Sequence, residues 1–160
     1  MKVVFLNPGE WFVGDSTHEV HTLLGSCVSI TLWDPVLHVG AMSHFLLTAG
    51  AVRAPVRRDG RYAEGAMALM LEGLARRGVP ASRCQAKIFG GGHMFPAQPR
   101  SGPVDVGRRN GEAARRLLRA QGIEVRAESL FGAGHRNIVF EIATGNVWAR
   151  QVRPPGVGAQ

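Results

Sequence analysis

Two stretches of the chain carry apolar residues at helical spacing, and the remaining apolar positions fall in short runs. A helix is predicted over residues 62–77, where apolar side chains recur every three or four positions and Gly78 to Pro80 supply a stop signal. A second helix is predicted over about residues 109–121, ended by Gly122. Strands are predicted at residues 19–24, 28–33, 39–47, 85–89, 123–128, 137–142 and 147–152, with another near the N-terminus.

The order of these elements predicts the fold class. Short turns such as Thr144-Gly145-Asn146 separate several neighbouring strands, which favours antiparallel hairpins. Seven or so strands and two helices that do not alternate strictly indicate an α+β fold. We expect mixed, mostly antiparallel β-sheets layered with two main helices as a three-layer sandwich. A single domain is expected over residues 1–153, followed by a flexible tail at residues 154–160.

The charge of the chain favours acidic partners. The net charge is +7, and 17 of the 19 basic residues are arginine, since Lys2 and Lys87 are the only lysines. Such a surface attracts anionic molecules. The arginines are spread along the chain, however, and no helix-turn-helix or zinc-finger pattern accompanies them. A solvated basic surface is therefore the favoured interpretation, an acidic protein partner comes second, and no nucleic-acid partner is expected.

Cysteine content and hydropathy indicate the cellular compartment in which the protein is expected. Cys27 and Cys84 are the only cysteines, too few for a disulfide framework or a four-cysteine zinc site. The apolar run at residues 3–6 is too short for a signal peptide, and no later segment approaches a membrane span. We expect a cytoplasmic protein with two free thiols, no membrane insertion, no metal and no cofactor. Cys84 is expected to be inert.

The spacing of Cys27 and His44 predicts a reactive pair. Asp34-Pro35 starts a turn between two predicted strands. If that turn sets Asp34 opposite Leu37, then Cys27 lies directly opposite His44, with Cβ atoms about 4.5–5.5 Å apart. A histidine at that distance can take the thiol proton and create a nucleophile.

The residues around Cys27 fit such chemistry, although another interpretation stays open. Gly25 and Ser26 are small, let a substrate approach the backbone closely, and precede the cysteine where backbone N–H groups can stabilise an oxyanion. Most pairs of one cysteine and one histidine in a hairpin are instead a buried thiol and a structural histidine.

Five segments together resemble one known family. They are T-L-L-G-S-C-V-S-I-T-L-W-D-P with G-A-M-S-H-F-L-L, then A-K-I-F-G-G-G-H-M-F, then V-G-R-R-N, and finally G-A-G-H-R-N-I-V-F-E-I-A-T-G-N-V. In this order, over roughly residues 8–150, they resemble the chemoreceptor glutamine deamidase family, CheD. The late G-G pair of the family reads Gly132-Ala133-Gly134 here, and the segment after His44 lacks the proline that many members carry.

The resemblance implies a function, a set of residues and a cysteine-hydrolase-like fold. Family members hydrolyse the side-chain amide of glutamines on the cytoplasmic helices of methyl-accepting chemotaxis proteins. Cys27 matches the nucleophile and His44 the general base. The third catalytic residue of the family is a threonine, which in some members lies six positions before the cysteine. Here His21 occupies that position and Thr22 is one nearer, so the role is carried to Thr22.

The glycines that follow Phe89 have two interpretations. Gly91 and Gly92 form a turn in the plain interpretation, and the substrate-side wall of the site in the one that the resemblance implies.

Other functions remain open at this stage. Some family members bind the chemotaxis phosphatase CheC, so the chain is alternatively a regulator that acts on receptors or CheC by binding alone. A cysteine hydrolase with another protein glutamine as substrate, and transglutamination when an amine replaces water, are further possibilities.

Overall fold

The computed structural model describes residues 1–48, 58–94 and 105–153. The strands are β1 (Lys2–Leu6), β2 (Trp11–Gly14), β3 (His18–Leu24), β4 (Val28–Asp34), β5 (Val39–Ser43), β6 (Gln85–Gly90), β7 (Glu124–Leu130), β8 (His135–Glu141) and β9 (Val147–Val152). The helices are α1 (Ala63–Arg76) and α2 (Val106–Gln121), with a short 3₁₀ turn at Ala81–Arg83. The tail predicted at residues 154–160 lies outside the described residues.

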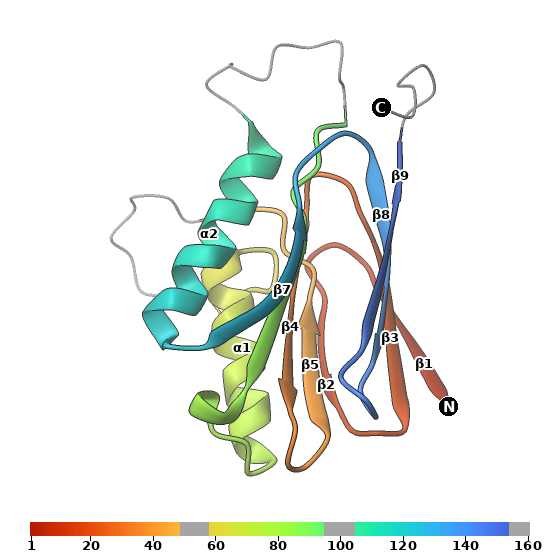
Figure 1. Cartoon of the computed structure of the whole chain (residues 1–160). Helices are drawn as coiled ribbons and strands as arrows, with labels where there is room; N and C mark the ends of the chain where they lie inside the picture. The colour runs from red at the N-terminus through yellow and green to blue at the C-terminus, as the bar shows by residue number, and fades with distance from the viewer. Residues whose placement is uncertain (49–57, 95–104, 154–160) are drawn as a thin grey trace.

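The elements form three layers, which confirms the predicted α+β sandwich (Figure 1). One sheet has the strand order β1-β3-β8-β9 and the other the order β2-β5-β4-β6-β7. Neighbouring strands are antiparallel except for the parallel pairs β1–β3 and β6–β7. Both helices cover one face of the five-stranded sheet, and the four-stranded sheet lies against its other face. No helix in the described part of the chain has the length and apolar character needed to cross a bilayer.

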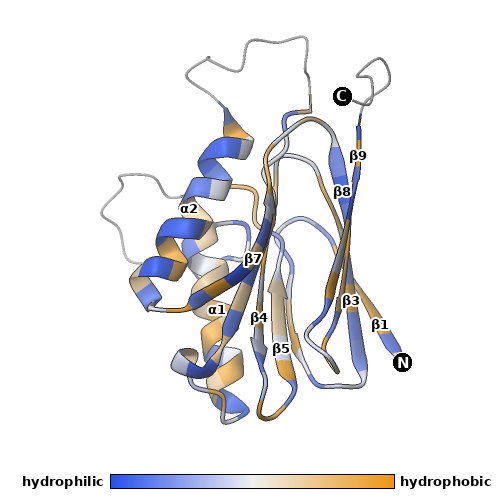
Figure 2. Cartoon of the chain, viewed as in Figure 1, coloured by the Kyte–Doolittle hydropathy of each residue, from blue (hydrophilic) through white to orange (hydrophobic). Residues whose placement is uncertain are grey.

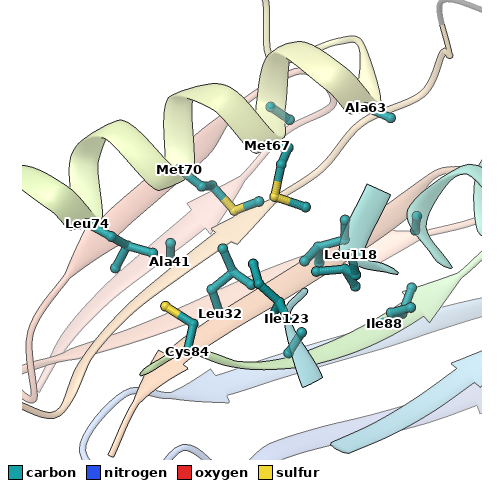
Figure 3. Packing of buried hydrophobic residues seen from close by; sticks show 14 of the residues in the cluster. Leu32, Ala41, Ala63, Met67, Met70, Leu74, Cys84, Ile88, Leu118 and Ile123 are labelled. Atoms are coloured by element: carbon teal, nitrogen blue, oxygen red, sulfur yellow. The ribbon is translucent and has the colours of Figure 1, made fainter. Parts of the chain in front are cut away.

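The hydrophobic core is divided by the five-stranded sheet. One cluster lies between this sheet and the helices, where Met67, Met70 and Leu74 of α1 point toward Leu32 and Ala41 of the sheet (Figure 3). The second cluster fills the space between the two sheets and includes Val20, Met42, Phe89, Ile138 and Phe140. Alternation along each central strand therefore sends side chains into two different cores.

The helices match the predicted ones closely, and the differences occur at their ends. Helix α2 begins three residues before its predicted start because the Asp105 side chain accepts a hydrogen bond from the Arg108 N–H and caps it. It ends where Gly122 takes a left-handed conformation, with φ of 67°. Most of α2 is hydrophilic and most of α1 hydrophobic (Figure 2), because arginines cover the exposed side of α2.

Two strand predictions need correction. The strand expected over residues 39–47 ends at Ser43, and only isolated bridges at Phe45 and Leu47 continue its line. Regular strand pairing ends here because the backbone of His44 bonds to the loop before β2 instead. The His44 N–H donates to Glu10 O, and the Gly9 N–H donates to His44 O. The N-terminal segment forms two strands, β1 and β2, where the apolar pattern predicted one.

Candidate active site

Thr22 and His44 meet in the space between the two sheets. Along β3, Val20, Thr22 and Leu24 are buried and alternate with more exposed residues, so Thr22 points inward. The Thr22 hydroxyl lies 2.7 Å from Nδ1 of His44, whose side chain comes from the end of the opposite sheet. Both residues are 2% exposed. His21, the competing candidate, is on the other face of β3 and contacts Glu19 at 2.6 Å.

The contacts of Thr22 determine which nitrogen of His44 carries the proton. The Thr22 hydroxyl donates to Leu6 O over 2.8 Å, so its single hydrogen is used. The oxygen can then only accept from His44, which requires a hydrogen on Nδ1. Neutral His44 therefore has an unprotonated Nε2. That is the form of imidazole that acts as a base.

The predicted register between Cys27 and His44 is wrong by two residues. Strands β4 and β5 pair Asp34 with Val39, and the same register places Val28 opposite Phe45. The turn is longer than expected because the Asp34 carboxylate accepts from Val36 N–H and Leu37 N–H, and the His38 N–H donates to Asp34 O. His38 closes the turn in a left-handed conformation, with φ of 52°.

A shift of two residues leaves both side chains on the same face of the sheet. Cys27 packs with the cluster between the sheets, as does Met42, which lies two positions before His44. Cys27 and His44 are thus diagonal rather than direct neighbours, a relation with typical separations of about 7–8 Å between residues. Among the described residues, no hydrogen bond joins the Cys27 sulfur to the imidazole.

Burial keeps this cysteine and histidine neutral. Burial lowers the pKa of His44 to about 4, against smaller raising effects from the Leu6 carbonyl and Glu10. Burial also raises the pKa of the Cys27 thiol. Both shifts disfavour the charged forms, so the free protein holds a thiol and a neutral imidazole rather than a thiolate–imidazolium pair.

The turn at Gly91 and Gly92 lies against residues 25–27, the segment between β3 and β4 that we call the cysteine loop. Gly91 N–H donates to Cys27 O and Gly92 N–H donates to Gly25 O, each over 2.9 Å. A Cβ on Gly92 would lie 2.4 Å from Gly134 O, so only glycine allows this approach. The turn at Gly91 and Gly92 therefore lies directly beside the segment that carries Cys27.

The segment Ser26-Cys27 carries two backbone N–H groups beside the thiol. No acceptor in the described ranges takes the N–H of Ser26 or of Cys27. Two adjacent N–H groups without partners, next to a thiol, can bind the oxygen of an attacked carbonyl.

Sequence reasoning missed two buried polar residues beside this loop. Asn110 is 1% exposed, and its Nδ2 donates to Ser26 O over 3.1 Å and to Leu46 O over 3.2 Å. Arg136 is 2% exposed and donates to Gly90 O over 3.2 Å and to the Phe131 carbonyl. Asn110 lies on the apolar face of the predicted second helix. Its position there could have identified it from the sequence, because an amide that is buried needs hydrogen-bond partners.

Cys84 lies in the cluster between the five-stranded sheet and the helices, whereas Cys27 packs against the cluster between the two sheets. Cys84 is 3% exposed in the core beneath α1 (Figure 3), and burial raises its pKa to about 11, as expected for an inert thiol. Within the described ranges, no group of three or more histidine, cysteine, aspartate or glutamate side chains is arranged to hold a metal ion.

Comparisons with known proteins agree with the motifs. The family model described as CheD chemotactic sensory transduction matches residues 47–151. Three relatives carry the name probable chemoreceptor glutamine deamidase CheD, followed by a number. The one from Albidiferax ferrireducens is 57% identical over 96% of this chain and 89% of its own. Those from Chromobacterium violaceum and Dechloromonas aromatica are 43% and 41% identical, over 94% and 91% of this chain and 78% and 85% of theirs.

A solved structure is only distantly similar. The crystal structure of Bacillus licheniformis hypothetical protein YfiH aligns with 74% of this chain and 49% of its own, at 16% identity and a TM-score of 0.46. That likeness is too remote to bear on function. The matched family model and the three relatives, by contrast, show that this chain belongs to the CheD family.

Proposed function

We propose that this protein is a glutamine deamidase that converts side-chain amides of chemoreceptor glutamines to glutamate, with Cys27 as the nucleophile. The names of its relatives supply the substrate class. The observation that carries the chemistry is the Thr22–His44 contact, which leaves Nε2 of His44 unprotonated on the face that it shares with Cys27.

The first half of the reaction forms a thioester. Nε2 of His44 takes the Cys27 proton as the sulfur attacks the amide carbon. The N–H groups of Ser26 and Cys27 bind the oxyanion that develops. His44 then gives its proton to the amide nitrogen, and the carbon–nitrogen bond breaks to release ammonia.

The second half releases glutamate. Nε2 of His44 takes a proton from a water molecule, whose oxygen attacks the thioester carbon. The carbon–sulfur bond breaks, and the sulfur regains its proton from His44. The net reaction is one amide and one water giving one carboxylic acid and one ammonia. Thr22 is the positioning residue of this cycle, because it holds the Nδ1–H throughout.

Burial of the pair suits this order of events. Because the His44 pKa lies at about 4, the imidazole is an available base at neutral pH. The imidazolium forms only during the reaction, when the tetrahedral oxyanion beside it balances its charge.

The substrate and the cellular location of the protein follow from the same proposal. The substrate is a cytoplasmic receptor helix, and the protein acts in the cytoplasm. A second role in binding the phosphatase CheC is compatible with this function, and the basic surface suits acidic helices.

The test is conversion of glutamine to glutamate in a purified receptor cytoplasmic fragment, read by peptide mass spectrometry. We expect conversion by the wild-type protein and loss of roughly 10²-fold or more with His44→Ala, since a positioned acid–base contributes 10²–10⁴-fold. Cys27→Ala should be inactive, and Cys84→Ala serves as the matched control with full activity. Unchanged conversion by Cys27→Ala would refute the proposal, and a biological effect that survives this substitution would favour the binding-only regulator.

A further inference from the structure

Asn110 connects the two segments that carry the proposed catalytic residues. Its Nδ2 is the only nitrogen of the side chain, and both of its hydrogens are used, one for Ser26 O and one for Leu46 O. Ser26 directly precedes Cys27, and Leu46 follows His44 by two residues. A single amide thus joins the backbone on one side of the nucleophile to the backbone on one side of the base.

This connection lies where strand pairing has ended. The regular β4–β5 ladder extends to Thr31 and Met42, and the isolated bridge between Val28 and Phe45 is the last pairing before the cysteine loop. In the described part of the chain, neither Ser26 O nor Leu46 O accepts a hydrogen bond from any other donor. On the Cys27 side of Val28, the Asn110 amide therefore holds the backbone at Ser26 and the backbone at Leu46 at a fixed separation.

Helix α2 gives Asn110 a rigid base. Its first turn is capped by Asp105 and lies against the glycine turn, since a Cβ on Gly107 would be 2.5 Å from both Gly91 O and Gly92 O. A helix held this closely leaves the Asn110 side chain little freedom. The same helix therefore sets the position of the cysteine loop, the glycine turn and the segment after β5 that carries His44.

We propose that Asn110 is a positioning residue, which sets the separation of Cys27 and His44 by holding the carbonyls of Ser26 and Leu46. The inference rests on the proposed function and extends it to a residue that does not touch the reacting atoms. Because Cys27 and His44 are diagonal neighbours, small changes in their separation decide whether the proton can be transferred. Misplacement of reacting groups by about 1 Å can cost roughly 10²-fold in rate.

The experiment uses Asn110→Ala and Asn110→Ser, with Leu118→Ala as the matched control. The serine variant keeps one donor but is too short to reach both carbonyls, and it remains informative if the alanine variant fails to fold. Leu118 is fully buried in the same helix, so its truncation removes core packing and lowers stability without removing either Asn110 hydrogen bond. Two quantities are measured: kcat and KM for receptor-fragment deamidation, and the rates of iodoacetamide alkylation at Cys27 and Cys84, resolved by mass spectrometry.

The two readouts should change in opposite directions. We expect kcat to fall about 10- to 100-fold in the Asn110 variants while KM stays within about twofold. Cys27 alkylation should become several-fold faster, because a released loop exposes a thiol whose burial now suppresses ionisation. Alkylation of buried Cys84 should not change, and Leu118→Ala should leave both kcat and Cys27 alkylation near the wild-type values.

Several results would overturn the inference. Unchanged kcat, a change confined to KM, unchanged Cys27 alkylation, an equal loss of kcat in Leu118→Ala, or faster alkylation of both cysteines would each leave Asn110 with a purely structural role. If the wild-type protein does not deamidate receptor fragments at all, the proposed function fails. The alkylation measurement on its own then decides whether Asn110 holds the loop.

Discussion

At the scale of single residues, the site consists of groups whose neighbours fix their protonation state. Thr22 places the proton of His44 on Nδ1, and burial prevents a second proton from binding Nε2. Cys27, in contrast, has no charged partner in the described part of the chain and remains a thiol because burial raises its pKa. In the proposed mechanism, the reactive thiolate therefore forms only when the substrate carbonyl arrives and is not present in the free protein.

The low pKa of His44 predicts a pH-dependent contribution to stability. The unfolded chain binds a proton at His44 below pH 6.5, whereas the folded protein binds it only below about pH 4. Stability should therefore rise with pH between 4 and 6.5 and lose this contribution as pH falls through that window. A shift from 6.5 to about 4 corresponds to on the order of 3 kcal/mol.

The measurement is the free energy of unfolding by denaturant at several pH values for the wild-type protein and for His44→Gln. Carboxylates with lowered pKa, such as Asp15 and Asp34, contribute in both proteins and cancel in the difference. The difference between the two curves should change across pH 4 to 6.5 and be flat above it. Parallel curves throughout this range would show that His44 is not buried in its neutral form.

At the scale of elements, the β4–β5 hairpin sets the geometry of the site, and one buried ion pair holds its turn. Asp34 is fully buried and receives two hydrogen bonds of 2.8 Å from the Arg83 guanidinium, as well as those of the turn backbone. The Arg83 hydrogen bonds are the main cause of the lowered pKa of this carboxylate. The turn thereby fixes the register that separates Cys27 from His44.

Removing the Arg83 charge should destabilise the fold, because it leaves the buried Asp34 carboxylate without its charged partner. The loss should exceed that of a surface ion pair, although the 34% exposure of the Arg83 side chain reduces it. Urea denaturation of Arg83→Met, which keeps the aliphatic stem, measures the effect. Arg76→Met is the matched control, because its ion pair with Glu72 is on the surface and should contribute less than about 1 kcal/mol. Equal effects of the two substitutions would contradict the assigned role of the turn.

The sequence was sufficient to predict most helices and strands, but not the register of the hairpin between Cys27 and His44. Helical spacing located α1 and α2, and alternation located most strands, because each is a local pattern. The turn after Asp34 was predicted two residues too short. Its length depends on the hydrogen bonds that the Asp34 carboxylate accepts from the Val36 and Leu37 N–H groups, and on the left-handed His38. Asn110 was missed because its partners are 84 and 64 residues away along the chain.

At the scale of the whole molecule, the three layers have separate tasks. Strand β3 of the four-stranded sheet contributes Thr22. The segments directly before β4 and directly after β5, at one end of the five-stranded sheet, carry Cys27 and His44, and α2 of the helical layer contributes Asn110. The site therefore lies between the sheets rather than on a single element. Such an arrangement requires the complete fold, which agrees with family membership that extends over nearly the whole chain.

The measurement that tests the central claim most directly is trapping of the covalent intermediate. If Cys27 forms a glutamyl thioester, hydroxylamine added to the reaction competes with water for the same carbon and yields a hydroxamate at the modified glutamine. We predict hydroxamate in place of glutamate in proportion to the hydroxylamine concentration, detected by mass spectrometry of the receptor fragment, and neither product with Cys27→Ala. Glutamate as the sole product at every hydroxylamine concentration would contradict the account, because it would mean that water attacks the amide without an acyl-enzyme.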